Sequence, residues 1–525
     1  MKYLHRISIL YLALPFVLFL FGWVRLTIAI PLAIILLFAL WRVVNQSPVS
    51  NPQFSNPPIT IYHLLVIGAW ALLSGVGGYA FQNWDHHWRN AVFHDLINFD
   101  FPVYYSQPES GPVKMLVYYV GYWLPAARIG KLLGWQAANF ALFLWTLLGL
   151  LLVTYHLASA LKTSPVKATL LLIFFSGLDA LGVLLLPKDY PTLLPPITHL
   201  EIWSGTQLQY SSFTTQLFWV FNQAVPAWLV ISVIARSEAT KQSKANLEIA
   251  SGTPSCVRCR EEQERPRNDV RSEFILLWAL CFFFAPLAAV GLLPYVLIEF
   301  IKDTDFKSPF KNLRWEVLLS AAIILLLSTF YFSSNTSAQQ RGLQSIPFAD
   351  FLAFFLLEGG ILWLALASVK WRDPRWVVTG LLLLLIPFIQ LGSGRDFVMR
   401  ASIAPLFYLM LMTGETVFNK TTPRLLLVTC YLLLALGALT SLYEINRSVY
   451  RTFDYYFLQP EDCSCDVPSS EPVTHLAPPG IPEKEHPDSL TADAIPTLKF
   501  MTDELSQNFI ANVRRTLYYR YIAPR

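Results

Sequence analysis

The stretch QAANFALFLWTLLGLLLVTYHLA, residues 136–158, decides the fold class, because it contains no Asp, Glu, Lys or Arg. A helix needs roughly 20 apolar residues to cross about 30 Å of hydrocarbon. Backbone N–H and C=O groups in lipid must bond within the segment, so such a span is a helix. The chain is 54% hydrophobic and 14% charged, whereas soluble domains carry about 25% charged residues. The sequence therefore predicts an all-α, polytopic membrane protein.

Similar apolar stretches recur along the chain and predict about thirteen spans. The expected spans are residues 7–24, 26–44, 61–79, 112–129, 136–158, 166–187, 219–235, 273–301, 316–332, 350–369, 376–392, 402–417 and 425–443. Stretch 273–301 contains two prolines and is interpreted as one span or as a helical hairpin. Stretch 166–187 contains a Ser-Gly pair and Asp179, and it is interpreted as one span or as two half-helices.

Basic residues predict the orientation, because loop Lys and Arg favour the cytoplasm. Lys2 and Arg6 place the N-terminus inside, and no small-residue cleavage site follows the first span, which we expect to be retained. Three spans then place loop 80–111 outside. Counting back from the last span puts loop 393–401 and the C-terminal tail outside as well. We expect a multi-pass protein of the bacterial inner membrane.

Four regions outside the spans complete the domain organisation. Residues 1–443 form the transmembrane domain with extracytoplasmic loops 80–111 and 187–218. Segment 236–271 has no aromatic residue and interleaves basic with acidic residues, which predicts a disordered insertion. The tail 444–525 contains a Pro- and Ser-rich linker at about 459–495. Its last part, 496–525, is either an amphipathic element on the membrane surface or a packed terminus.

The loop 80–111 contains the first group of candidate site residues, in the stretch WDHHWRNAVFHDL, 84–96. They are Asp85, His86, His87, Arg89, His94 and Asp95. On a helix Asp85 and Arg89 share a face and form an ion pair or part of a site. His87 and His94 would stand about 10.5 Å apart, which disfavours a three-histidine zinc site. A carboxylate base or a looser metal site remains open, as does a solvated loop at the membrane surface.

Two further polar stretches contain the remaining candidates. HLEIWSGTQLQYSS, 199–212, contributes His199, Glu201, Trp203 and Tyr210. A carboxylate beside a tryptophan suits a sugar, and the ring equally suits a membrane interface.

GRDFVMRAS, 394–402, contributes Arg395, Asp396 and Arg400. Arginine suits phosphate because its fork donates two bonds, and an internal ion pair is the alternative. Asp179 and Glu358 lie within apolar stretches, where each could pair internally or line a cavity.

These three stretches, on a chain of many spans, resemble the GT-C superfamily of membrane glycosyltransferases. Members of this superfamily have many transmembrane helices and a large extracytoplasmic loop with an essential acidic residue. They use sugars carried on polyprenyl phosphate or pyrophosphate. The stretch WDHH…HDL followed by FPVYY is similar to loops of uncharacterised bacterial GT-C-like membrane proteins. The specific stretches cover under a fifth of the chain, whereas the topology covers most of it.

The resemblance implies a role for each group of residues. Asp85 would be the catalytic base or would orient the acceptor, Asp95 or Glu201 would assist the acceptor or a divalent cation such as Mg or Mn, and Arg400 with Arg395 would hold the donor phosphate. The family often has two nearly adjacent acids in this loop, whereas His86 and His87 follow Asp85 here.

The implied partners are a lipid-linked sugar donor, membrane lipids and an envelope glycan, lipid or protein acceptor, with no nucleic acid. The competing interpretations are a transporter or flippase for a lipid-linked glycan, and a non-catalytic envelope assembly protein.

Overall fold

The computed structural model describes residues 2–46, 60–105, 114–186, 191–205, 208–251, 272–302, 314–335, 341–392, 395–454, 509–512 and 516–524. Within them the chain is mostly helical. Nine helices are long and apolar enough to cross a membrane, and four shorter apolar helices accompany them. The protein is therefore an all-α, multi-pass membrane protein.

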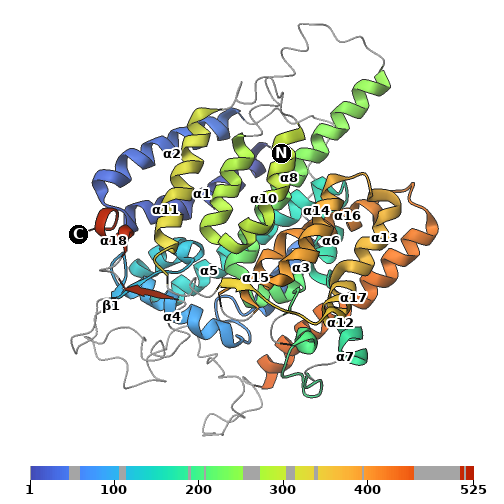
Figure 1. Cartoon of the computed structure of the whole chain (residues 1–525). Coiled ribbons are helices and arrows are strands. Elements are labelled where there is room, and N and C mark those ends of the chain that lie inside the picture. Colours follow the sequence, from blue (N-terminus) through green and yellow to red (C-terminus); the bar gives the residue numbers. More distant parts are fainter. Residues whose placement is uncertain are drawn as a thin grey trace.

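The first four helices connect the two ends of the molecule. They are α1 (Lys2–Trp23), α2 (Leu26–Gln46), α3 (Ile61–Leu73) and α4 (Trp84–Asn98). The N-terminus lies near one end, and α4 lies near the other, where α7 and strand β1 are also found (Figure 1). The three helices before α4 therefore carry the chain to the end opposite the N-terminus, as the order of spans predicts.

The remaining helices build the body of the molecule around α8. They are α5 (Leu124–Ala160), α6 (Pro165–Phe174), α7 (Asp179–Leu185), α8 (Phe213–Ser251), the helix Ser272–Phe284, α10 (Pro286–Lys302), α11 (Trp315–Phe332), α12 (Phe348–Phe355), α13 (Ile361–Lys370), α14 (Pro374–Leu385), α15 (Asp396–Ala401), α16 (Ile403–Val417), α17 (Arg424–Phe453) and α18 (Leu517–Tyr521). The α8 and α15–α16 spans are almost wholly buried. In contrast, α17 exposes leucines and valines, as expected of a face that meets lipid.

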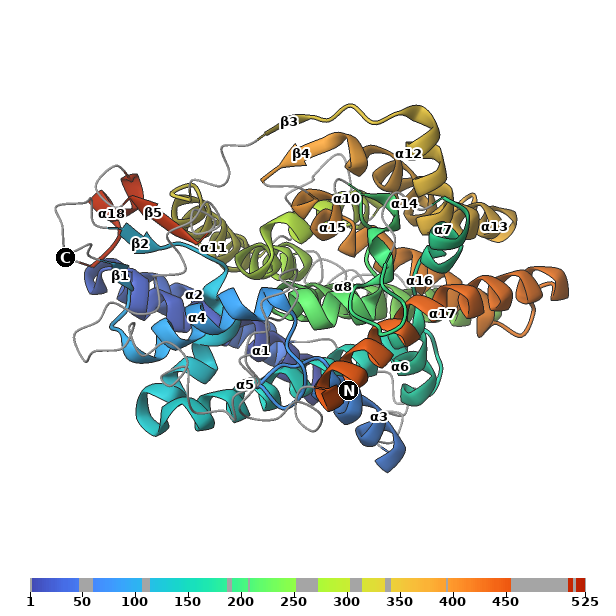
Figure 2. The same ribbon diagram turned by 90° about the horizontal axis from the view of Figure 1, so that it is seen from below.

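Two small antiparallel sheets lie outside the helical body. Strands β1 (Tyr104–Tyr105), β2 (Lys114–Leu116) and β5 (Ile510–Asn512) form the first sheet, in the order β1-β2-β5. Strands β3 (Arg341–Leu343) and β4 (Ile389–Leu391) form the second. Figure 2 shows the first sheet beside α18 and the second beyond α12 and α15.

Several expected spans have different boundaries in the structure. Stretch 112–129 is not a span of its own, because β2 occupies its start and α5 begins at Leu124. This segment continues into the span 136–158 with a break at Gly134, whose φ is 84°. Stretch 376–392 ends in strand β4, which pairs with β3. Both errors have one cause, since short apolar strands and helices have the same composition.

Two ambiguous stretches are resolved. Stretch 166–187 consists of the half-helices α6 and α7, separated at 175–178, so the second alternative is confirmed. Stretch 273–301 consists of two short helices, Ser272–Phe284 and Pro286–Ile301. The chain bends sharply between them, as shown by the hydrogen bond from Trp278 Nε1 to the carbonyl of Ala289 at 2.8 Å. Eleven residues of straight helix would separate these positions by about 16 Å.

The predicted insertion starts too early. Helix α8 runs on to Ser251, so the first residues of segment 236–271 are helical rather than disordered. Arg236 lies 3.2 Å from the ring of His156, and Glu238 lies 3.6 Å from Arg375. Both therefore belong to the packed helix. The rest of the segment, from 252, lies outside the described residues, as does the predicted linker at 459–495.

The C-terminal residues form a packed terminus. Tyr518 is fully buried, and its hydroxyl donates to the carbonyl of Trp23. Arg25, in the turn between α1 and α2, donates from Nε to Ala523 and from Nη2 to Arg520, both through backbone oxygens. With β5 paired to β2, the terminus is attached on two sides. It is not an element lying free on the membrane surface.

We expect Tyr518→Ala to detach the C-terminal residues from the turn between α1 and α2. Replacing a buried aromatic side chain with alanine lowers the free energy of unfolding by about 3–5 kcal/mol. The measurement is the rate at which a protease removes a C-terminal tag from the protein in lipid nanodiscs. Tyr521→Ala is the matched control, since Tyr521 is 59% exposed. Equal cleavage rates for both variants would contradict the docking.

Candidate functional site

A kink in the central helix fixes the start of α4. The backbone of α8 leaves helical torsions at Val220, where φ is −133° and ψ is 35°. The carbonyl of Phe218 accepts hydrogen bonds from Asn83 Nδ2 at 2.7 Å and from His86 Nε2 at 3.0 Å. The Asn83 side chain also accepts from the backbone N–H of Asp85, which caps α4. The first turn of α4 is thus attached to the kink.

His86 takes part in this attachment of α4 to the kink of α8. It is buried, and its ring stacks on Phe221 with 5.5 Å between centroids. Burial and the charge of Arg89 lower its pKa to about 3, so the ring is neutral and donates to Phe218. The predicted role of His86 in substrate binding is therefore replaced by a structural one. The side chain of His87 lies outside the described residues.

Charged residues of α15 interact electrostatically with the start of α4. Arg89 Nη2 lies 2.7 Å from Asp85 Oδ2, and Arg400 Nη1 lies 3.0 Å from Asp396 Oδ2. The charge of Arg400 also interacts with Asp85, although the two helices are far apart in the sequence. We call these four residues the α4–α15 charge cluster. Two of the predicted stretches, 84–96 and 394–402, therefore converge.

The α4–α15 charge cluster combines an accessible carboxylate with buried guanidinium groups. The side chain of Asp85 is 31% exposed, whereas that of Arg89 is 3% exposed. Arg89 Nη1 and Arg400 Nε are buried and have no hydrogen-bond partner among the described residues. Buried donors of this kind normally have a partner. The arrangement can therefore accept an anionic group while leaving one carboxylate open to solvent.

Two tyrosines border the α4–α15 charge cluster, and no motif in the sequence pointed to them. Tyr118 and Tyr119 both interact with Arg400. Burial raises the pKa of Tyr119 to about 12, against the opposing effect of Arg400. The hydroxyl group of Tyr119 is therefore neutral and adds a donor near the arginine.

His199 lies beside Trp219 of α8, where the charge of Arg395 acts on its ring. The ring of His199 lies 5.2 Å from that of Trp219, and both Arg447 and Arg395 act on its charge. Burial and these two cations lower the pKa of His199 well below its usual range. Arg447 of α17 also stacks over Phe81 and Trp219. Loop 187–218 thus reaches Arg395 through His199.

The other candidates of loop 187–218 lie in a different place. Glu201, Trp203 and Tyr210 are all buried. Trp203 Nε1 donates to Asp179 and Glu358, and the hydroxyl of Tyr210 donates to the carbonyl of Leu383. Trp203 therefore neither anchors the membrane interface nor presents its face to a sugar. Its indole connects the two acids that the sequence places inside spans.

His94 and Asp95 face away from Asp85. The ring of His94 packs edge-on against Trp135 of α5, and its Nδ1 lies 3.8 Å from Asp95 Oδ1. Asp95 is fully buried. His94 thus helps to pack α4 on α5, and the roles of His94 and Asp95 in acceptor binding stay predictions.

The described residues give no support to the divalent-cation alternative. No group of three His, Cys, Asp or Glu side chains in the described part of the chain could hold a metal ion. Both oxygens of Glu201 already accept bonds, from Gln209 Nε2 at 2.6 Å and from the N–H of Ser212 at 2.9 Å. Desolvation and the neighbouring Asp179 raise the pKa of Glu201 to about 8. A carboxyl group that holds its proton this firmly is a poor cation ligand.

Comparison with known proteins adds no family to this description: no family model, no curated protein and no solved structure matches the chain.

Proposed function

We propose that this protein is a membrane glycosyltransferase that moves a sugar from a polyprenyl-phosphate-type lipid to an envelope acceptor on the extracytoplasmic side. The observation that carries the proposal is the electrostatic interaction of Asp85 with Arg400, next to buried guanidinium donors that have no hydrogen-bond partner among the described residues. A carboxylate that accepts a proton and a cation that meets a leaving phosphate are the two groups such a transfer requires.

The reaction would be a direct displacement at the anomeric carbon. Asp85 takes the proton from the acceptor hydroxyl as its oxygen attacks the sugar. The bond from the anomeric carbon to the phosphate oxygen breaks, and the lipid phosphate leaves with the bonding electrons. Arg400 stabilises the negative charge of the leaving phosphate, with Arg395 near it. Because the α4–α15 charge cluster lies where a span begins, a donor could keep its lipid in the membrane while its head reaches Asp85.

A transporter or flippase for a lipid-linked glycan is the second candidate. The break between α6 and α7 and the π-helical turn Leu356–Gly360 favour it, because broken helices carrying charges inside spans are typical of transporters. Such a protein would move its cargo through that region and would tolerate substitution of Asp85. The non-catalytic envelope protein would tolerate it too.

We expect Asp85→Asn to lower glycan transfer about 10²–10⁴-fold, because the amide keeps the shape but cannot act as a base. The measurement is mass spectrometry of envelope glycans from a deletion strain complemented with each variant at equal protein level. Asp100→Asn is the matched control, since Asp100 lies exposed in the same loop. An unchanged glycan profile in the Asp85 variant would contradict the glycosyltransferase and favour the transporter or assembly protein.

We expect Arg400→Lys to weaken donor binding about tenfold or more, because a hydrogen bond to a charged group contributes about 1.5–3 kcal/mol. Lysine keeps the charge but loses the planar fork. The measurement is the donor KM and kcat in reconstituted vesicles, with exposed Arg341→Lys as the control. A donor KM equal to that of the unmodified protein would exclude Arg400 from phosphate binding.

A further inference from the structure

Three carboxyl groups are buried together where helices are interrupted. Asp179, Glu201 and Glu358 are 0%, 1% and 2% exposed. Asp179 begins α7 after the break that follows α6, Glu358 lies in the π-helical turn Leu356–Gly360, and Glu201 lies in the 3₁₀-helical turn Leu200–Ser204. We call them the buried carboxyl cluster. It is separate from the α4–α15 charge cluster, and the inference below does not depend on the proposed function.

A single donor is shared by two of these groups. Trp203 Nε1 lies 3.1 Å from Asp179 Oδ1 and 3.0 Å from Glu358 Oε1. Asp179 Oδ2 accepts from the hydroxyls of Ser176 at 3.1 Å and Thr440 at 3.0 Å. Asp179 is therefore fully provided with neutral donors. One indole N–H cannot satisfy a second anion in addition.

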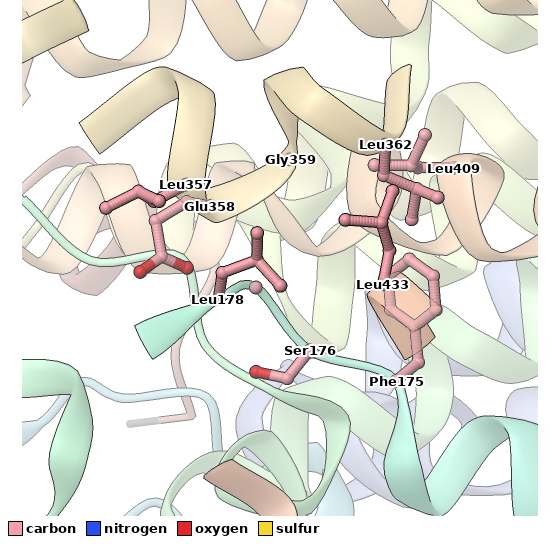
Figure 3. A pocket seen from close by; sticks show the side chains of 10 residues that line it. Phe175, Ser176, Leu178, Leu357, Glu358, Gly359, Leu362, Leu409 and Leu433 are labelled. Atoms are coloured by element: carbon pink, nitrogen blue, oxygen red, sulfur yellow. The ribbon is translucent and has the colours of Figure 1, made fainter. Parts of the chain in front are cut away.

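Glu358 has an oxygen without a donor. Its Oε2 is buried and has no hydrogen-bond partner among the described residues. Glu358 lines a small pocket together with Ser176, Gly177 and Leu178 from the break (Figure 3). A Cβ on Gly177 would lie 2.1 Å from Oε2, so only glycine allows this approach. A buried carboxyl oxygen without a hydrogen-bond donor indicates that this oxygen carries a proton or binds a group other than the described residues.

No positive charge compensates the buried carboxyl cluster within the described residues. Of the elements packed against one another here, α7 contributes Asp179, the turn Leu200–Ser204 contributes Glu201, and the π-helical turn contributes Glu358. Tyr210 also acts on Glu358, and α17 contributes Thr440. The charged pair Glu444–Arg447 of α17 instead faces Trp219.

Two adjacent anions without a cation in a medium of low dielectric constant are strongly unfavourable. Carboxyl groups that share a site resolve this by keeping one proton between them. Asp179 Oδ1 and Glu358 Oε1 lie 3.1 Å and 3.0 Å from the same indole nitrogen, so the two carboxyl groups are neighbours, and a hydrogen bond between them requires that one of them carries a proton. Asp179 already accepts three bonds from neutral donors, so Glu358 is the group that carries the proton.

We propose that the buried carboxyl cluster is a proton-binding site, in which Glu358 binds one exchangeable proton and uses it to donate a hydrogen bond to Asp179. The pocket beside Gly177 borders the Glu358 side chain. While the proton is bound, it joins the π-helical turn to the break between α6 and α7, next to the backbone bond from Leu178 N–H to Leu357 C=O at 2.9 Å. When the proton leaves, two anions face one indole N–H and repel each other.

This site predicts a definite dependence of stability on pH. Because the folded protein holds the proton more tightly than the unfolded chain, its contribution to stability is full at low pH. The contribution decreases as the pH rises and is lost once Glu358 ionises in the folded protein. Glu358→Gln keeps a hydrogen-bond donor toward Asp179 but has no titrating proton. The stability of this variant should therefore depend less on pH over the range in which Glu358 ionises in the folded protein.

The experiment uses the full chain in lipid nanodiscs. With Glu201→Gln as the background, which removes the signal of the other protonated acid, infrared difference spectra between acidic and alkaline buffer should show loss of a buried carboxylic-acid C=O band, and adding Glu358→Gln should remove this band. The thermal midpoint of the unmodified protein should fall as the pH rises, and that of Glu358→Gln should change less. Asp350→Asn, on the preceding helix α12, is the control and should keep both signals.

Two outcomes would overturn the proposal. The first is a carboxylic-acid band that persists unchanged in Glu358→Gln. The second is a thermal midpoint that rises with Na⁺, K⁺ or Mg²⁺ at constant pH in the unmodified protein and not in Glu358→Gln, which would make the site a metal-cation site. Asp179→Asn gives an independent reading if Glu358→Gln does not fold. Its amide donates to Glu358, so the band should titrate at lower pH, and an unshifted titration would also overturn the proposal.

Discussion

The kink of α8 at Val220 is the feature on which the placement of the charged residues depends. A straight helix would bond its own carbonyls, whereas here the carbonyl of Phe218 accepts from Asn83 and His86. In a membrane such a group must have a partner, because water is absent. The same residues cap α4 and fix its first turn. The position of Asp85 therefore follows from a hydrogen-bonding requirement of the central helix, and it lies within the electrostatic range of Arg400 on α15.

The same requirement explains the second interrupted region. The chain between α6 and α7 leaves helical geometry, and Leu178 N–H is satisfied by Leu357 in the π-helical turn rather than by its own helix. The two interruptions therefore hold each other. Glycines make the approach possible, since a Cβ at Gly437 would lie 2.6 Å from the carbonyl of Ser176. Such a paired interruption needs polar side chains near it, and Asp179, Trp203 and Thr440 provide them.

Apolar stretches were sufficient to predict the fold class, but not every boundary. Composition could not distinguish Lys114–Leu116 or Ile389–Leu391 from helix, because their strand pairing depends on residues far away in the sequence. The charged stretches of the candidate site were recognisable because charges are rare in this chain. Their grouping was not, since Glu201 and Trp203 follow His199 closely in sequence and yet join a different set of side chains. Arg447 was missed because the predicted final span ended before it.

The two groups of charged residues differ in sign, and this difference separates what they can bind. The α4–α15 charge cluster contains as many cations as anions, with Arg395 and Arg447 nearby, so an added anion improves its charge balance. The buried carboxyl cluster contains acidic groups and no basic one among the described residues, so it favours a proton or a positively charged ligand. Loop 187–218 contributes to both, through His199 on one side and Trp203 on the other. Only three residues lie between His199 and Trp203, and they belong to the 3₁₀-helical turn Leu200–Ser204. The two sites are thus chemically distinct, although one short segment of backbone contributes side chains to both.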